Sequence, residues 1–394
     1  MKNYINSQGF VSVTDTSDIL YIQENVQLTG SLSVSGSFSV GNVTMKNARG
    51  PKIVVGNSLA GDTLNDCDYL DAGDGVQLAL AIAAASPGYN VQVRPGLIQL
   101  TGAITLPNFV NLRFSGHGTV VRPSTLDRRA FILGTGCKLS DLRLEVTTPS
   151  VGATGTNLIQ FATLCTIQNC WILTSGYTNA TVNESLRYFV AADTAATNSL
   201  LHNVYLSPPN FQQTPLTQSM TAIGTTMTTS DNSPVRISDC TIVNGDIGIE
   251  CKGNAVVTGC IIQAPRRRGM LLSALTTNSY RHIVDACRIL MAGFSTDDSA
   301  GIEITTGTRA GGATSIISNC IISTGTSIPA SSAGIRLSGT GNGTIISGTA
   351  IDTFPIGLEV AVGQTNVSAK GTIRGASTPV SDASPSLLNE MRTI

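Results

Sequence analysis

Paired carboxylates are the first residues of this sequence whose types suggest chemistry. Asp297 and Asp298 stand side by side in STDDSAGIEI (295–304), just ahead of a predicted strand that carries Glu303. Two carboxylates can hydrolyse a glycosidic bond, and a carboxylate cluster can hold calcium beside an arginine base. These three residues are the candidate catalytic residues. The alternative, which we favour, is that the two aspartates cap a turn.

A second group of charges recurs at one position of short GIEx segments. Glu250, Glu303, Arg336 and Glu359 each follow a glycine and an isoleucine or leucine. If the segments are neighbouring strands, these side chains stack in steps of about 4.8 Å. They form either a carboxylate groove for a sugar or an alternating ladder of opposite charges, and we favour the ladder. Leu271 interrupts the series, which weakens a continuous groove.

Basic and aromatic residues suggest ligand contacts elsewhere. Arg266, Arg267 and Arg268 in PRRRGM form the one basic cluster of the sequence. This cluster either contacts an anionic glycan or phosphate, lies in a solvated turn, or pairs with acidic residues of a neighbouring subunit. Trp171, the single Trp, follows Cys170 in a predicted strand and should point outward, where it could stack on a sugar. One Trp and few Tyr support an extended saccharide groove only weakly.

Five of the nine cysteines occupy the same position of a recurring segment. The segment reads apolar, any, small or Asn/Asp, Cys, any, apolar, as in ISNCII (317–322). Because apolar residues flank each cysteine, we expect reduced core residues rather than disulfides. The five are Cys170, Cys240, Cys260, Cys287 and Cys320. The sequence has no CxxC pair and no His beside a Cys, so we expect no metal and no cofactor.

The cysteine segments alternate with the GIEx segments from about residue 90 to 375, at intervals of roughly 20–36 residues. This alternation of strand, turn, strand and loop predicts an all-β fold, a right-handed parallel β-helix in which apolar residues stack inward in columns. Asn169, Asp239 and Asn319 suit its tight turns, because Asn and Asp tolerate left-handed backbone angles. AGDGVQLALAIAAASPG (72–88) predicts a short N-terminal capping helix, with Asp74 as its N-cap, that covers the open end of the stack.

Four regions follow from these patterns. Residues 1–50 are expected to be an N-terminal virion anchor and an alternating-strand stem, since LTGSLSVSGSFSVGNVTM (28–45) alternates apolar residues with Ser, Gly and Asn. Such a strand needs partners, so we favour a threefold stem over a flexible strand lying along the next domain. Residues 51–71 are the expected connector, 72–375 the β-helix and 376–394 a C-terminal tail without repeat character.

Composition limits the functions open to the chain. Charged residues make up 12% of the 394 residues, against about 25% in a typical protein. The formal net charge of −1 gives no electrostatic argument for binding nucleic acid. No run reaches membrane-spanning length, and MKNYINSQGF has no apolar signal core, so we expect neither membrane insertion nor export by a signal peptide. The expected site of synthesis is a reducing cytoplasm.

The opening of the predicted β-helix resembles that of a known family. AGDGVQLALAIAAAS, NVQVRPGLIQL and LPNFVNLRFSGHGTVV (within 72–121) are similar to the start of pectate-lyase-like β-helix domains, specifically those of phage tailspikes and virion fibres. The sequence departs from that pattern at 76–78 and at Ile98, which affects only the capping turn. The paired aspartates are similar to those of polygalacturonases. The GHG that accompanies them in those enzymes lies far upstream here, at 116–118.

The resemblance implies a homotrimer on a virion. We therefore expect a structural virion protein of a tailed phage, a fibre, spike or decoration, whose N-terminal segment contacts other virion proteins and which adheres to host-surface glycans. The alternative is an enzymatic tailspike depolymerase that cleaves host polysaccharide as a glycosidase or lyase. Carboxylates converging in a cleft would favour the enzyme, and a Ser/Thr-rich face without them would favour the structural role.

Overall fold

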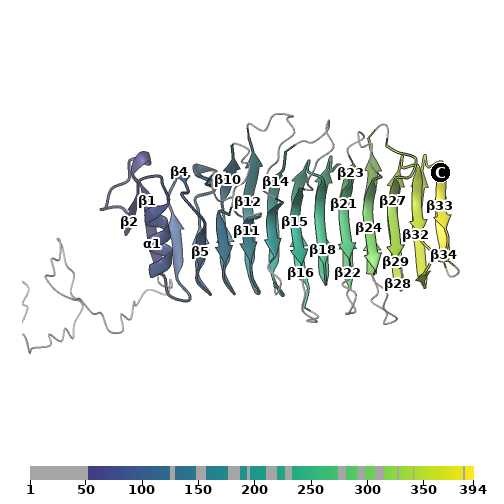
Figure 1. The fold of residues 1–394 in the computed structure, drawn as a ribbon, viewed down its shortest axis with the longest axis horizontal. Coiled ribbons are helices and arrows are strands. Elements are labelled where there is room, and N and C mark those ends of the chain that lie inside the picture. Colours follow the sequence, from purple (N-terminus) through teal and green to yellow (C-terminus); the bar gives the residue numbers. More distant parts are fainter. Residues whose placement is uncertain are drawn as a thin grey trace, which may run out of the picture. The chain divides into compact units, whose positions relative to one another are not determined.

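The computed structural model describes residues 52–394, apart from gaps at 125–128, 148–156, 176–186, 193–195, 210–219, 227–232, 274–280, 292–297, 307–314, 326–327, 340 and 385–386. All described residues belong to one compact unit, 49–394, and the predicted anchor and stem at 1–50 lie outside them. Within the unit, parallel strands form stacked coils along one axis (Figure 1).

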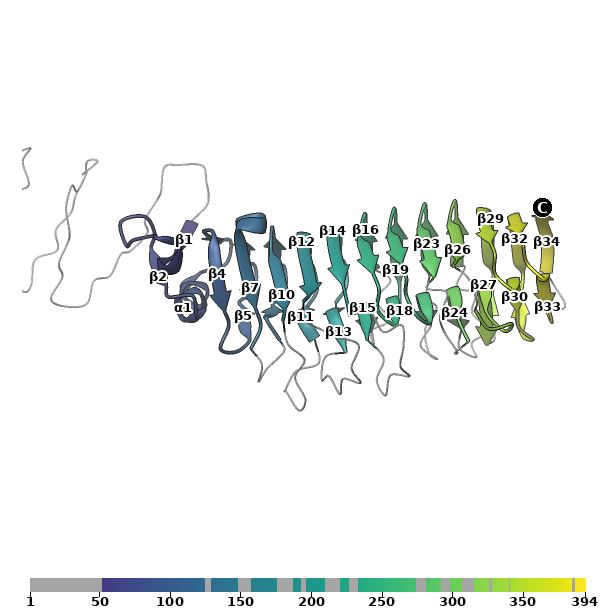
Figure 2. The same ribbon diagram turned by 90° about the horizontal axis from the view of Figure 1, so that it is seen from above.

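Two large parallel sheets make up the stack (Figure 2). The larger sheet contains β1 (Lys52–Asn57), β2 (Tyr69–Asp71), β3 (Asn90–Val93), β4 (Gly96–Gln99), β6 (Asn111–Arg113), β7 (Thr119–Arg122), β9 (Lys138–Ser140), β10 (Arg143–Val146), β12 (Thr166–Thr174), β14 (Leu200–Ser207), β16 (Val235–Ser238), β17 (Thr241–Val243), β19 (Ala255–Thr258), β20 (Ile261–Gln263), β22 (His282–Asp285), β23 (Arg288–Met291), β25 (Ser315–Ser318), β26 (Ile321–Thr324), β29 (Thr344–Asp352), β32 (Val367–Arg374) and β34 (Leu387–Thr393). The smaller sheet contains β5 (Ile104–Leu106), β8 (Phe131–Leu133), β11 (Asn157–Phe161), β13 (Tyr188–Ala192), β15 (Thr221–Thr226), β18 (Ile247–Lys252), β21 (Arg268–Ser273), β24 (Ala300–Thr306), β27 (Ala333–Gly339), β30 (Ile356–Val360) and β33 (Thr378–Asp382).

Short elements complete the unit. Two strands, β28 (Gly341–Asn342) and β31 (Gln364–Thr365), form a separate parallel pair. One α-helix, α1 (Val76–Ala84), and two 3-10 helices, η1 (Ser58–Ala60) and η2 (Gly116–Gly118), are the helices of the described residues.

Each coil visits the smaller sheet once and the larger sheet twice. The chain runs from β18 through β19 and β20 to β21, and β21 then lies beside β18 with Ile249 opposite Met270. Parallel strands joined in this way follow a right-handed path. The prediction of a right-handed parallel β-helix is confirmed. Strand pairing extends beyond 72–375, because β1 pairs with β3 and with β2, and β33 and β34 pair with β30 and β32.

The predicted turn residues lie at the bend that divides the larger sheet into two strand lines. Asn169, Asp239 and Asn319 all have φ of 53°, in the left-handed region. Their side chains also link successive coils, because the Asn169 amide donates to Asp141 at 3.2 Å and the Asn203 amide donates to Asn169 at 3.0 Å. The turn prediction is confirmed, and each bend aims the residue that follows it into the core.

The cysteines that follow these bends are buried core residues. All nine cysteines of the chain are free thiols, and all but Cys67 are buried. The Sγ of Cys170 donates to the Gln168 carbonyl at 3.2 Å, and that of Cys240 to the Ser238 carbonyl at 3.3 Å. Burial raises the pKa of Cys170 to about 12, which leaves no reactive thiolate near neutral pH. The expectation of reduced core cysteines is confirmed.

The glycine of each GIEx segment is required by packing between the two sheets. A Cβ added at Gly301 would lie 2.2 Å from Cγ2 of Ile322 and 2.6 Å from the Gly334 carbonyl. We expect Gly301→Ala to lower the free energy of unfolding by about 1–3 kcal/mol through overpacking, measured by urea denaturation. Gly102→Ala is the control, because a Cβ there meets no atom within 4 Å. Equal stability of the two variants would contradict this account.

The predicted capping helix is present, but Asp74 is not its N-cap. Helix α1 buries Leu78 and Ile82 at the end of the stack (Figure 1), and its N-cap residue is Gly75, which makes no side-chain cap. The fully buried Asp71 serves the helix start instead. Its Oδ1 accepts from the amides of Gly73 and Gly75 at 2.7 and 3.1 Å, and its Oδ2 accepts from the Leu78 amide at 3.0 Å. The half-buried Asp74 accepts one bond, from Val76 at 3.0 Å.

Candidate functional site

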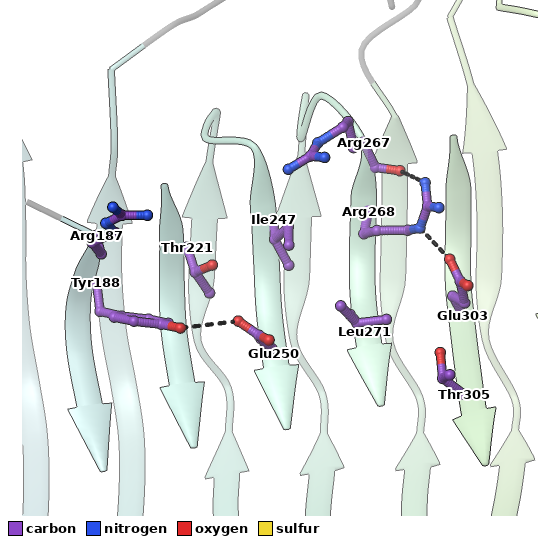
Figure 3. A pocket seen from close by; sticks show the side chains of 10 residues that line it. All are labelled: Arg187, Tyr188, Thr221, Ile247, Glu250, Arg267, Arg268, Leu271, Glu303 and Thr305. Carbon is purple, nitrogen blue, oxygen red and sulfur yellow. Dashed lines mark hydrogen bonds and ion pairs between the residues drawn. The ribbon is translucent and has the colours of Figure 1, made fainter. Parts of the chain in front are cut away.

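An open groove crosses the outer face of the smaller sheet between β13 and β24 (Figure 3). Its volume is about 490 Å³, within the range of about 300–1,000 Å³ typical of small-molecule sites. The lining joins a phenol, two carboxylates, guanidinium groups, hydroxyls and two aliphatic side chains: Arg187, Tyr188, Thr221, Ile247, Glu250, Arg267, Arg268, Leu271, Glu303 and Thr305. Because strands in register bring these side chains together, five successive coils contribute to one site.

Tyr188 and Glu250 form one end of the groove. The Tyr188 hydroxyl donates to Glu250 Oε2 at 3.4 Å, and Lys252 Nζ lies 2.9 Å from Glu250 Oε1. The Tyr188 ring reaches Glu250 by lying over Gly224, where an added Cβ would stand 2.4 Å from the ring. Burial and the charge of Glu250 raise the pKa of Tyr188, and the bond to Glu250 raises the pKa of Lys252. The phenol therefore stays protonated and available as a donor.

Arg268 and Glu303 form the other end. The Arg268 guanidinium donates to Glu303 and also to the backbone carbonyl of Asp298, the latter at 2.6 Å. Ser338 Oγ donates to the second oxygen of Glu303 at 3.2 Å. Both side chains are largely buried, at 17% and 13% exposed, so this ion pair is more rigid than an exposed one. The pair presents a fixed guanidinium and carboxylate to the groove.

The predicted charge column runs through this groove and continues beyond it. Glu250 pairs in register with Leu271, Leu271 with Glu303, Glu303 with Arg336, and Arg336 with Glu359. Arg336 donates to Glu359 at 2.5 Å, as expected of an alternating ladder. Leu271 interrupts the column as predicted, but it lines the groove and does not close it. A ladder and a groove therefore coexist on this face.

The candidate catalytic aspartates are not shown to form a pair. Asp297 lies outside the described residues. The exposed Asp298 binds the Arg336 guanidinium, with Nη2 2.8 Å from Oδ1, and so acts as a structural partner at the start of β24. Of the two described candidates, Glu303 lines the groove and Asp298 is not among its lining residues.

The basic cluster is partly neutralised within the chain. Arg267 binds the buried Asp246, with Nε 2.8 Å from Oδ1, and Arg268 binds Glu303. The Arg266 amide donates to the Gly245 carbonyl at 2.9 Å, in the turn before β21. Arg267 and Arg268 line the groove, so they remain candidate ligand contacts, and carboxylates of the same chain hold both guanidinium groups.

Trp171 lies away from the groove, on the larger sheet. It points outward as predicted and is half-buried, while the preceding Cys170 is buried. Its ring lies against His117, with centroids 4.0 Å apart and the ring planes tilted by 41°, and Tyr205 is its neighbour in the next coil. This makes a short aromatic platform separate from the groove.

The described residues show neither a metal cluster nor a membrane-spanning helix. They contain no group of three or more His, Cys, Asp or Glu side chains placed to hold a metal ion. Among them, no helix has the length and hydropathy to cross a membrane.

Sequence reasoning missed Tyr188 as a member of the site. Its contact with Glu250 spans 62 residues and skips the strand between them. Aligning YFVAA (188–192) and AIGTT (222–226) with the GIEx repeat would have placed Gly224 beside Glu250, with an open path for the ring. The number of residues between these strands differs from that between the GIEx segments, so the repeat spacing does not reveal this register.

Comparison with known proteins identifies the class of fold. No protein-family model and no curated protein matches the sequence. A mannuronic acid-specific polysaccharide lyase from human gut microbiota aligns with a TM-score of 0.53 at 12% identity, over 79% of this chain and 78% of that one. The tailspike of E. coli bacteriophage HK620, in complex with a pentasaccharide, aligns with a TM-score of 0.55 at 14% identity, over 75% of this chain and 62% of that one.

A surface adhesin of Streptococcus pneumoniae aligns with a TM-score of 0.51 at 12% identity, over 80% of this chain and 92% of that one. At these identities the likeness concerns the fold. The chain is a parallel β-helix protein, structurally similar to right-handed β-helix lyases, tailspikes and adhesins. It spans about three fifths of the length of the tailspike chain.

Proposed function

We propose that this chain is a virion protein of a tailed phage, a fibre, spike or decoration, and that its groove binds a host-surface glycan. The observation that carries the adhesive role is the joining of Tyr188, Glu250, Arg268 and Glu303 in one open groove. Fixed donors and acceptors of this kind suit the many hydroxyls of a sugar. The tailspike-like opening at 72–121 and the fold shared with a saccharide-bound tailspike support the virion role.

Binding tests this proposal directly. The full-length chain is applied to an array of bacterial capsule and lipopolysaccharide oligosaccharides, and the best-retained oligosaccharide is titrated against variants. We expect Glu250→Gln and Arg268→Gln each to weaken binding about 10- to 100-fold, the effect of losing a hydrogen bond to a charged group. Glu359→Gln, in the same charge column outside the groove, should bind like the parent chain. No retained oligosaccharide, or parent-like binding by both groove variants, would contradict the proposal.

A polysaccharide depolymerase is the second candidate, favoured by the presence of two carboxylates in one groove. Glu250 and Glu303 lie on two strands separated by the strand of Leu271. Two strand spacings put their Cα atoms about 9–10 Å apart. An acid–base pair needs one carboxyl to carry a proton, whereas Glu250 is bound by Lys252 and Glu303 by Arg268. Release of new reducing ends from the bound polysaccharide would support the enzyme, and intact polysaccharide after long incubation would support adhesion alone.

A further inference from the structure

Two aromatic side chains lie next to each other on the outer face of the larger sheet. Trp171 of β12 and Tyr205 of β14 are opposite each other in register, and the two strands are adjacent (Figure 1). Both rings are half-buried and point outward, because the chain neighbours of each are buried core residues. Aromatic residues make up 5% of the chain, so two of them at one outward position are a specific feature of these coils.

The stack does not require aromatic residues at this outward position. In register, the position is occupied by Val120 and Arg143 in the coils before the two rings and by Thr241 in the coil after them. The core beneath is filled by inward side chains of the same strands, among them Cys170 and Leu206. Partly exposed Trp and Tyr side chains are enriched at binding interfaces. The two rings therefore indicate a contact with another molecule.

His117 holds the indole ring of Trp171 in place. The two ring centroids are 4.0 Å apart and the ring planes are tilted by 41°. His117 belongs to η2, directly before β7, so this contact reaches across the strand of Arg143. A ring that is already fixed loses little conformational freedom when a ligand binds. His117, Trp171 and Tyr205 therefore form a preorganised surface, the aromatic platform.

Charged hydrogen-bonding groups lie beside the aromatic platform. Arg143 is the register neighbour of Trp171 on β10, and its Nη2 donates to Glu145 Oε1 at 2.5 Å. Arg122 Nη2 donates to the other oxygen of Glu145 at 3.3 Å. One largely buried carboxylate thus fixes two guanidinium groups, whose side chains remain 33% and 35% exposed. Because a guanidinium carries five N–H donors, both groups can also donate to a ligand.

We propose that the aromatic platform is a second glycan-binding site, on which the face of a pyranose ring stacks against Trp171 and Tyr205. The C–H groups of a sugar ring are weakly positive and the face of an aromatic ring is negative, so the two faces attract each other. Arg143 lies one strand spacing of about 4.8 Å from Trp171, within reach of the hydroxyl groups of the stacked sugar.

The platform is separate from the groove but lies at the same level of the stack. The chain runs from β12 through β13, which carries Tyr188 of the groove, to β14. The platform lies on the larger sheet and the groove on the smaller one, and the two share no lining residue. Each copy of the chain then binds a glycan-covered surface through two sites, and the loss of one site leaves the other. The inference rests on the proposed function only for the source of the glycan, a host surface.

Tryptophan fluorescence tests this second site, because Trp171 is the only Trp of the chain. The full-length chain and its groove variant Glu250→Gln/Arg268→Gln are titrated with the capsule and lipopolysaccharide oligosaccharides of the array. We expect at least one oligosaccharide to shift the emission of both chains to shorter wavelength, as the indole loses water, with the same midpoint. An oligosaccharide that binds only in the groove should leave the emission unchanged.

Variants of Tyr205 separate stacking from a general effect on the fold. Tyr205→Phe keeps the ring and should bind within about 2-fold of the parent, whereas Tyr205→Leu loses the flat face and should bind about 10-fold more weakly. The control is Ile321→Ala, an exposed residue in the same register column further along the stack, which should titrate like the parent. Far-UV circular dichroism establishes that each variant is folded.

Three outcomes would overturn the second site. These are an emission that no oligosaccharide shifts, a folded Tyr205→Leu variant that binds like the parent, and a Tyr205→Leu variant of lower solution mass, which would make the rings a subunit contact. The groove variant separates this result from the proposed function. If it keeps the emission shift and is retained on the array like the parent, the groove fails and the platform stands. If it loses all retention and the parent shows no emission shift, the reverse holds.

Discussion

Asp71→Ala is expected to lower the free energy of unfolding by about 4 kcal/mol. The substitution leaves the amides of Gly73, Gly75 and Leu78 without their acceptor at a buried position. Each buried donor left unpaired costs about 1–3 kcal/mol. The loss also removes a negative charge from the positive end of the helix dipole. Urea denaturation followed by circular dichroism measures the effect.

Two variants define the cause of this loss. Asp71→Asn keeps one acceptor oxygen and the shape of the side chain, so it should fall between Asp71→Ala and the parent, at about 2 kcal/mol. Asp74→Ala removes one bond at the rim of the helix and should cost about 0.5–1 kcal/mol. If Asp74→Ala proved as costly as Asp71→Ala, the sequence-based choice of Asp74 as the cap would be right after all.

Acid should destabilise the chain through His282. This side chain is 1% exposed, its Nδ1 lies 3.3 Å from Ser315 Oγ, and burial lowers its pKa to about 4, against the backbone carbonyls of Gly253 and Ser273. The unfolded chain binds a proton at the ordinary pKa of about 6.5. The stability that comes from the neutral ring is therefore complete above pH 6.5 and is lost as the pH falls towards 4, by about 3 kcal/mol in total.

The variant His282→Gln separates the contribution of His282 to the pH dependence of stability from that of the carboxylates. Urea midpoints of the parent and of His282→Gln are compared at pH 7, 5.5 and 4. Acidic residues affect both chains alike, so the parent should lose about 3 kcal/mol more than the variant between pH 7 and 4. An equal loss in the two chains would show that the ring is already protonated, or already solvated, in the folded state.

Several copies of the groove on one virion would act together in adhesion. Copies that each offer one groove bind a repeating surface glycan with a much higher effective affinity than one copy does. Single-groove affinity can then be modest, which agrees with the mixed, partly neutralised lining seen between Tyr188 and Glu303.

The sequence determined the coil, its bends and its core. The cysteine segment recurs along the chain, and its pattern predicted Asn169, Asp239 and Asn319 as left-handed turn residues and the following cysteines as core. These features depend on residues within a few positions of one another, so local pattern is enough to predict them. The register of Glu303, Arg336 and Glu359 followed from the same repeat.

Only the tertiary structure decided which side chains meet between coils. The acceptor for the helix start is Asp71 and not Asp74, because the loop turns a buried carboxylate towards three amides. Tyr188 joins Glu250 because Gly224, on the strand between them, leaves room for its ring. The number of residues between neighbouring strands varies from coil to coil, so the sequence has no fixed period that would reveal these contacts.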